Sequence, residues 1–297
     1  MDTTFTLNRP DGEKLACYNW RSKVKPWAVL VIAHGMGEHA GRYRTSLDML
    51  ISSGVIIYAL DQRGHGYTAK LNEREVGDFG SGGFDAVVGD LAAVVKHARV
   101  ENPDLPLMLL GHSMGSFITQ AFLIEHGEMV DGAVLVGTTA VDILAEAMMK
   151  NKDIITALNR PFEPGRTEFD WLSSDPQQVD AYIDDPLCGF SLVPDSMISL
   201  FSQGARLARK CELALIPSCL PIYILVGAKD VLLTDFGRLE PLVDRYINAG
   251  LQPTVVIYPE GRHEILNESN REEVVVNLLK WLKITSESVI LRTNDLT

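Results

Sequence analysis

Short apolar runs alternate with amphipathic segments along most of the chain. The apolar runs are rich in Val, Ile and Leu, as is typical of parallel strands covered on both faces, and they lie at 28–35, 55–61, 106–113, 132–138, 221–230 and 253–261. The segments between them have apolar residues at helical spacing and lie at 43–53, 84–100, 116–126, 239–249 and 271–283. This alternation predicts an α/β fold, with a mostly parallel, twisted sheet flanked by helices.

The two ends of the chain depart from this rhythm. Near the start, the strand-like segments 4–8 and 15–20 are joined by a Pro-Asp-Gly turn signal, which predicts an antiparallel hairpin. The polar end VILRTNDLT has no clear pattern, and we expect it to be a loosely held tail.

The alternation also stops in the second half of the chain. Beyond residue 139 there are helical patches, such as 143–158, but no convincing strand until the run at 221–230. We therefore expect an α/β core made of residues 1–139 and 213–297, with a helical cap inserted at 140–212.

The composition is that of a globular protein with an acidic surface. The 297 residues are 46% hydrophobic and 22% charged, close to globular averages. Asp and Glu outnumber Lys and Arg by 39 to 27, and the net charge of −12 argues against nucleic acid as a partner. The start lacks the features of a signal peptide and no apolar run approaches 18 residues, so we expect a cytoplasmic protein.

The most specific motif is Gly111-His112-Ser113-Met114-Gly115, a G-x-S-x-G between a predicted strand and a predicted helix. In that context the serine sits on a tight turn with its hydroxyl exposed, and the two glycines leave room for the turn. Backbone N–H groups at the start of the helix point towards charge that develops near Ser113. The pattern predicts a nucleophilic serine.

A serine nucleophile needs a base, and the chain has seven histidines. Six of them lie in predicted helices or in early loop motifs: His34, His39, His65, His97, His112 and His126. His263 follows the last predicted strand, where an α/β-hydrolase carries its histidine. We therefore expect His263 to be the base.

The carboxylate that orients this histidine should lie between the two in the sequence. Asp230 ends an apolar strand, and the carboxyl ends of parallel strands form the crevice where such sheets place their sites. Asp235 is the alternative, although it would equally suit a helix N-cap. The strand-end position favours Asp230.

An oxyanion hole needs two N–H donors, one of them from the residue after the nucleophile, Met114. The second should come from the loop after the strand 28–35, where glycines permit a close approach and Met36 is the candidate. The alternative for this loop is metal binding by His34 and His39, which is disfavoured because no third ligand stands at a zinc-like spacing.

The cysteines give no further sign of a metal site. They show neither C-x-x-C spacing nor a His-rich neighbourhood, so we expect reduced, mostly buried thiols at Cys17, Cys188, Cys211 and Cys219.

Five motifs taken together resemble the monoacylglycerol lipase and lysophospholipase branch of the α/β-hydrolases: HGMGEHAGRY, DQRGHG, GHSMG, GAKD and GRHEILNE. The resemblance covers roughly residues 3 to 284. It implies a triad of Ser113, Asp230 and His263, oxyanion donors at Met36 and Met114, and no cofactor or metal. Two positions differ from the usual pattern: Ser116 replaces a glycine, and DQRGHGYTAK lacks the usual Ser and Gly after its GHG.

The resemblance also implies a structural rather than catalytic role for Asp61, Arg63 and His65. The cap then becomes the specificity element, because apolar, Met-containing helices above a serine can line an acyl-chain tunnel. Its apolar side chains include Met148, Met149, Ile154, Ile155, Leu158, Phe190, Leu192, Met197, Ile198, Leu200 and Phe201. For each of them, simple packing of the cap on the core stays open.

The leading hypothesis is hydrolysis of a carboxylic ester with an apolar acyl chain, such as a monoacylglycerol or lysophospholipid, through an acyl-enzyme. The expected partner is a small-molecule acyl ester, with transient membrane contact through the cap as a further possibility. Two alternatives are a peptidase of the serine aminopeptidase type and a hydrolase-fold protein that binds ligands without turnover. An aspartate-nucleophile dehalogenase is excluded by Ser113.

Overall fold

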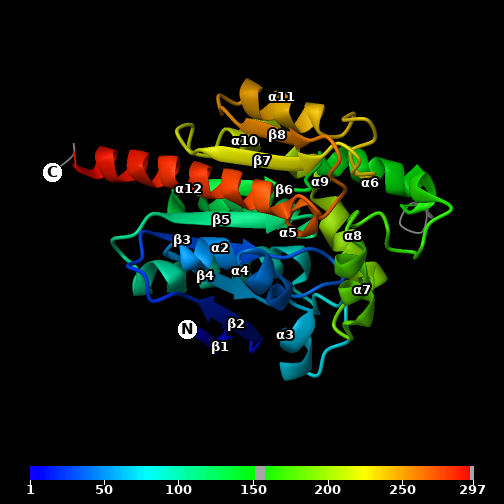
Figure 1. The fold of residues 1–297 in the computed structure, drawn as a ribbon, viewed down its shortest axis with the longest axis horizontal. Coiled ribbons are helices and arrows are strands. Elements are labelled where there is room, and N and C mark those ends of the chain that lie inside the picture. The colour runs from blue at the N-terminus through cyan, green and yellow to red at the C-terminus, as the bar shows by residue number, and fades with distance from the viewer. Residues whose placement is uncertain (151–157, 295–297) are drawn as a thin grey trace.

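The computed structural model describes residues 1–150 and 158–294 (Figure 1). Its eight strands are β1 (Asp2–Asn8), β2 (Lys14–Trp20), β3 (Ala28–Ala33), β4 (Val55–Leu60), β5 (Leu107–His112), β6 (Gly132–Val136), β7 (Ile222–Gly227) and β8 (Thr254–Tyr258). They form one sheet in the order β1-β2-β4-β3-β5-β6-β7-β8. The pairs β1–β2 and β2–β4 are antiparallel and the other neighbours are parallel, which confirms the predicted hairpin and mostly parallel sheet.

Helices flank the sheet and cover one end of it. They are α1 (Tyr43–Ser46), α2 (Asp48–Ser52), α3 (Gly66–Leu71), α4 (Gly83–Glu101), α5 (Met114–His126), α6 (Val141–Lys150), α7 (Pro176–Asp184), α8 (Pro194–Ser202), α9 (Gly204–Leu207), α10 (Lys210–Leu213), α11 (Glu240–Asn248) and α12 (Arg271–Asn294). Four short 3-10 turns are η1 (Ala40–Arg42), η2 (Gly127–Met129), η3 (Arg160–Phe162) and η4 (Ile265–Asn267).

The central strands are buried on both faces, and alternate residues along each strand enter different cores. On β3, Val31 joins a core shared with α4, α5 and α11, whereas Ile32 joins a core shared with α2 and α12. This arrangement explains why the strands read as continuous apolar runs rather than as alternating patterns.

Two helices differ from the expected boundaries. The helix predicted at 43–53 is divided into α1 and α2 at Leu47, whose backbone (φ −106°, ψ 15°) is not helical. The expectation of a loose tail is wrong as far as Asn294, because α12 continues to that residue. Residues 284–294 contain no Gly or Pro to end the helix, and Thr285 and Ser286 are buried.

Helices α6 to α10 lie between β6 and β7 in the sequence, and α6 to α9 gather at the carboxyl ends of the parallel strands, whereas α10 lies beside α11 (Figure 1). In the described part of this region no strand is present. Of the helix predicted at 143–158, α6 accounts for the part up to Lys150, and Ile154 and Ile155 lie outside the described residues. The exact division into core and cap stays a prediction.

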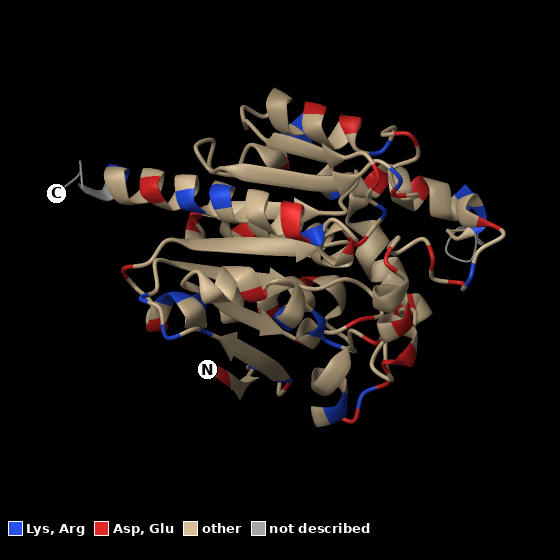
Figure 2. Ribbon diagram, viewed as in Figure 1, with Lys and Arg blue, Asp and Glu red and all other residues tan. Residues whose placement is uncertain are grey.

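The surface is acidic overall, and in Figure 2 basic residues stand among acidic ones rather than in one block. All four cysteines are free thiols, but Cys211 and Cys219 are exposed, so the expectation of mostly buried thiols is wrong for these two. Cys211 lies on the short helix α10, and Cys219 lies in the turn before β7. Among the described residues, no helix combines the length and apolar character needed to cross a membrane.

Candidate active site

Ser113 stands at the turn between β5 and α5. Its backbone angles, φ 52° and ψ −120°, are rare for a residue with a side chain, and its N–H donates to Val136 O at 2.9 Å. A Cβ atom at Gly111 would overlap the Gly115 carbonyl, and one at Gly115 would overlap the Ala33 carbonyl. The turn therefore requires both glycines, and it leaves the Ser113 side chain partly exposed.

Asp230 and His263 lie side by side in the loops that follow β7 and β8. Asp230 follows β7, His263 follows β8, and His263 Nδ1 lies 2.8 Å from Asp230 Oδ2. Because a carboxylate only accepts hydrogen bonds, Nδ1 carries the proton and Nε2 is left as the basic nitrogen. The Leu232 N–H donates to Asp230 Oδ1 at 2.9 Å and holds the carboxylate in place.

The His263 ring is enclosed by aromatic side chains, with Trp171 at 5.1 Å and His112 at 4.9 Å between ring centroids. Burial alone would lower the pKa of His263, but the adjacent Asp230 carboxylate raises that pKa above its ordinary value. No hydrogen bond joins Ser113 Oγ to His263 within the described residues. Such a bond often forms only when substrate is bound.

Asp235, the alternative acid, does not approach this histidine. It lies exposed in a turn after β7, with φ 49°. Asp230 is by contrast 3% exposed and paired with His263. Of the two candidates, the structure therefore places Asp230, which the sequence favoured, beside His263.

The loop at residues 34–39, which we call the glycine loop, passes beside Ser113. A Cβ atom at Gly35 would lie 3.3 Å from Ser113 Cβ. Within the described residues, the N–H groups of Met36 and Met114 have no hydrogen-bond partner, and both residues line the same cavity as Ser113. The arrangement suits the two donors expected of an oxyanion hole.

A buried network of charged side chains holds the glycine loop in place. Glu38 Oε1 accepts from Gly35 N–H at 2.6 Å and from the Tyr43 hydroxyl at 2.8 Å, while Arg42 lies 2.7 Å from both Glu38 and Glu264. Burial by itself would raise the pKa of Glu38, but Arg42 and a hydrogen bond from His112 hold that pKa well below its usual range. Glu38 is therefore a carboxylate that fixes the loop.

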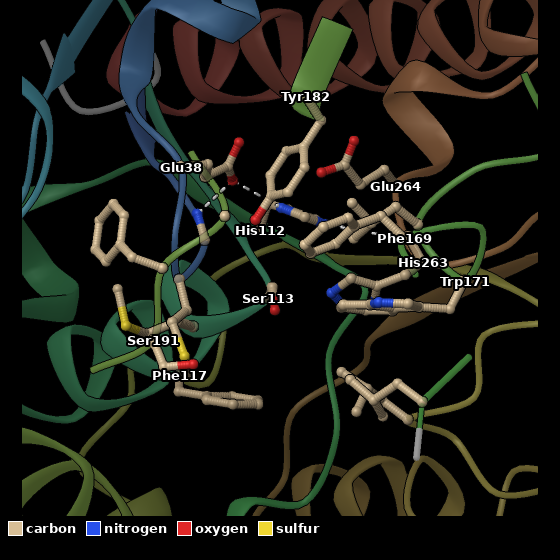
Figure 3. Close-up of a pocket in the computed structure, with 18 of the residues that line it drawn as sticks. Glu38, His112, Ser113, Phe117, Phe169, Trp171, Tyr182, Ser191, His263 and Glu264 are labelled. Carbon is tan, nitrogen blue, oxygen red and sulfur yellow. Dashed lines mark hydrogen bonds and ion pairs between the residues drawn. The ribbon is translucent and has the colours of Figure 1, made fainter. Parts of the chain in front are cut away.

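Ser113 and His263 open into a mainly apolar cavity of about 150 Å³ (Figure 3). Its apolar wall comes from α5, from the predicted cap, which includes α6, and from the segment after β7. The wall includes Phe117, Leu144, Met148, Leu158, Phe190, Phe201 and Leu232. Four of the cap side chains considered from the sequence line it: Met148, Leu158, Phe190 and Phe201. Three others do not line it: Leu200 is buried in the core, and Met149 and Ile198 are exposed.

Several residues around the cavity were not assigned a role from the sequence. They include Trp171, which faces His263, Tyr182, which reaches from α7 towards Ser113, and Glu264 (Figure 3). Both Trp171 and Tyr182 lie within the segment WLSSD...DDPLCGF, which resembles the cap of the lipase branch. The spacing of apolar residues in this segment did not show which of its side chains face the cavity.

Ser116, where the resembling family usually has glycine, takes part in the elbow. Its hydroxyl donates to Ser113 O at 2.6 Å, and its oxygen lies at hydrogen-bond distance, 2.9 Å, from the Thr138 hydroxyl. The extra hydroxyl thus links the turn at Ser113 to the segment after β6.

The loop residues that the resemblance treats as structural are held by ion pairs and backbone groups. Asp61 accepts from the Ala40 N–H and the Tyr18 hydroxyl, Arg63 pairs with Asp90, and His65 Nδ1 lies 2.8 Å from Arg63 O. None of Asp61, Arg63 and His65 lines the cavity at Ser113.

One group of residues brings possible metal ligands together. Atoms of His39, Asp185 and Cys188 lie within 4.8 Å of one another. However, His39 Nδ1 accepts from Gly41 N–H at 3.2 Å, so Nε2 carries the proton and donates to Asp185 at 2.9 Å. This hydrogen bonding uses the lone pair that a cation needs. The His34 ring makes other hydrogen bonds: Nδ1 donates to Gly35 O, and Nε2 accepts from Gln62 N–H.

Comparison with known proteins gives a family. Residues 24–270 match the family described as serine aminopeptidase, S33. A monoacylglycerol lipase of Mycolicibacterium smegmatis is 29% identical over 277 residues, which covers 91% of this chain and 93% of that protein. A monoglyceride lipase of Mus musculus is 32% identical over 238 residues, covering 78% of this chain and 74% of the mouse protein.

Solved structures agree with these sequence matches. The crystal structure of a highly thermostable carboxyl esterase from Bacillus coagulans, in complex with glycerol, has a TM-score of 0.84 at 25% identity. The alignment covers 95% of this chain and 98% of the esterase. The α/β-hydrolase fold implied by the motifs is confirmed.

Proposed function

The chain belongs to the serine aminopeptidase S33 family of α/β-hydrolases, and from this premise we propose that it hydrolyses carboxylic esters with apolar acyl chains, of the monoacylglycerol or lysophospholipid type. The observation that carries the proposal is that Ser113 and the Asp230-paired His263 open into one mainly apolar cavity. A serine, its base and an apolar wall are what an acyl ester of this kind requires.

In this mechanism Ser113 Oγ attacks the ester carbonyl while His263 Nε2 accepts the serine proton. The N–H groups of Met36 and Met114 stabilise the negative charge on the carbonyl oxygen. His263 then donates the proton to the leaving alcohol, and the acyl-enzyme is hydrolysed by water that His263 activates in the same way. Asp230 keeps the imidazole in the productive tautomer throughout.

The charges around the cavity favour an ester over a peptide with a free amino group. Two carboxylates line the cavity, Glu38 and Glu264, and both are already paired with Arg42. The remaining surroundings of Ser113 are largely apolar. A substrate ammonium group would therefore lose its hydration without gaining a free counter-ion.

The apolar cavity predicts a preference for longer acyl chains. Burying a methylene contributes about 0.8 kcal/mol, so four additional methylenes should raise kcat/KM by roughly two-hundredfold until the cavity is filled. We expect octanoyl and lauroyl p-nitrophenyl esters to be better substrates than the acetyl ester. Both substrates release a glycerol oxygen, and the phosphocholine group lies away from the attacked carbonyl, so a monoacylglycerol should be cleaved at least as readily as lysophosphatidylcholine.

Side-by-side kcat/KM values for these substrates and for an aminoacyl amide test both halves of this prediction. An optimum at acetyl would contradict an acyl-binding cavity. Much faster cleavage of the amide than of any ester would support the aminopeptidase alternative instead.

The pairing of His263 with Asp230 predicts the pH dependence of the reaction. His263 acts as a base only when neutral, and Asp230 raises its pKa above the ordinary value of about 6.5. Activity should therefore fall on acidification with a midpoint above pH 6.5. A profile of kcat/KM against pH for p-nitrophenyl octanoate measures it, and a midpoint clearly below pH 6 would show that Asp230 does not raise the pKa of the base.

A further inference from the structure

One carbonyl group joins the cap to the glycine loop. Gly37 O accepts hydrogen bonds from the Tyr182 hydroxyl and from Gly189 N–H, each at 2.9 Å. Tyr182 lies on α7 and is buried, and Gly189 lies farther along the same cap segment. The cap thus supplies two donors to a single carbonyl next to Met36.

The glycine loop depends on such contacts for its conformation. Gly37 has φ +65°, and a Cβ atom there would overlap the Phe190 carbonyl, so the position requires glycine and fits closely against the cap. A loop with glycines at 35 and 37 has many accessible conformations when it is not held. Its direction at Met36 must therefore be set by hydrogen bonds to side chains and to the cap.

The loop is held on both sides of Met36. On the core side, Gly35 N–H donates to Glu38 Oε1 at 2.6 Å. On the cap side, Gly37 O is held by Tyr182 and Gly189. The Met36 N–H lies between these two anchored points, and an oxyanion donor contributes fully only when it points at the position of the developing charge.

We propose that Tyr182 is a positioning residue whose hydroxyl, by holding Gly37 O, orients the Met36 N–H as an oxyanion donor. The inference rests on the proposed ester hydrolysis and adds to it a dependence of the chemical step on the cap. The cap then completes the oxyanion hole as well as the acyl cavity.

A single substitution isolates this hydrogen bond. The Tyr182 ring packs on Phe169, with 5.2 Å between ring centroids, and Arg42 lies 4.8 Å from the ring centroid. Tyr182→Phe keeps this ring and removes only the hydroxyl. The matched control is Tyr246→Phe, because Tyr246 is also buried but its hydroxyl has no hydrogen-bond partner among the described residues.

With p-nitrophenyl octanoate, we expect Tyr182→Phe to lower kcat by roughly three- to tenfold, the effect of losing one neutral hydrogen bond, because Gly189 still holds the carbonyl. KM should change by less than about twofold, since the apolar wall is intact. Tyr246→Phe should match the wild type in both constants.

Two further measurements separate positioning from general loosening of the cap. Octylboronic acid forms a tetrahedral adduct with the serine oxygen, whose proton passes to the histidine, so its Ki should rise by about the same factor as kcat falls. The Ki of 1-octanol, which occupies the acyl cavity without this adduct, should not change. Hydrogen exchange in peptides covering residues 34–39 should be faster in Tyr182→Phe and unchanged in Tyr246→Phe.

An unchanged kcat in Tyr182→Phe, beside an active wild type, would overturn the inference. A rise in KM and in the Ki of 1-octanol at unchanged kcat would overturn it too, because Tyr182 would then be only a wall of the cavity. If the wild type cleaves no ester, the proposed function fails by itself. Hydrogen exchange then decides the inference, and equal exchange at residues 34–39 in both proteins rejects it.

Discussion

Replacing Ser113 by alanine should lower the turnover of p-nitrophenyl octanoate by about 10⁴–10⁶-fold, because no other group in the proposed mechanism attacks the carbonyl. The fold should be retained. Alanine has the same Cβ as serine, so it adds no strain at φ 52°, and the partly exposed Ser113 hydroxyl donates no hydrogen bond among the described residues. Labelling by a fluorophosphonate, which requires the serine oxygen, should disappear together with turnover.

The neighbouring Ser116 provides the control. Its hydroxyl lies one turn along α5 and bonds to Ser113 O and Thr138, so Ser116→Ala disturbs the same elbow without removing the nucleophile. We expect that variant to be labelled and to keep at least about a tenth of the wild-type turnover. If Ser113→Ala keeps more than a few per cent of the activity, Ser113 is not the nucleophile, whatever Ser116→Ala does.

Replacing Asp230 by asparagine should lower kcat by about 10⁴-fold. Asparagine fits the site and its side-chain oxygen can still accept from Leu232 N–H, but the side chain no longer offers His263 Nδ1 a carboxylate. The imidazole then loses the partner that fixes its tautomer and stabilises its charged form. Thermal unfolding of the variant checks that the loss of activity is not a loss of structure.

Asp235→Asn is the matched control for this variant. Asp235 is exposed, and its positive φ of 49° is one that asparagine tolerates well. The kcat should therefore stay within about twofold of the wild type, and the thermal unfolding of the variant should match that of the wild type. A greater loss of activity in Asp235→Asn than in Asp230→Asn would mean that the acid has been misplaced.

The sequence by itself was enough to predict the strands of the core and most of its helices, although it missed the short helix α3. Each central strand is covered on both faces, so its whole length is apolar, and runs such as 28–35 and 132–138 stand out from their neighbours. The turn at Ser113 is also marked in the sequence, because Gly111 lies against the carbonyl of the nearby Gly115, and Gly115 lies against the carbonyl of Ala33 on the neighbouring β3, where no larger residue fits. Features decided within a few neighbouring residues leave a readable pattern.

Other features were decided only in the tertiary structure. Asp230 and Asp235 are both acidic residues after β7, and only the position of β8 beside β7 brings His263 to one of them. The inward faces of the cap, with Met148 in the cavity and Met149 exposed, depend on how its helices lie on the core.

The contact between Tyr182 and Gly37 joins residues 145 positions apart. Near its predicted end, α12 packs on β6 through Thr285, which lies close to Gly132. Such contacts have no period and no fixed spacing. The sequence therefore determined most of the elements that form and which side chains are candidates for catalysis, whereas the packing of distant segments decided which of those side chains meet.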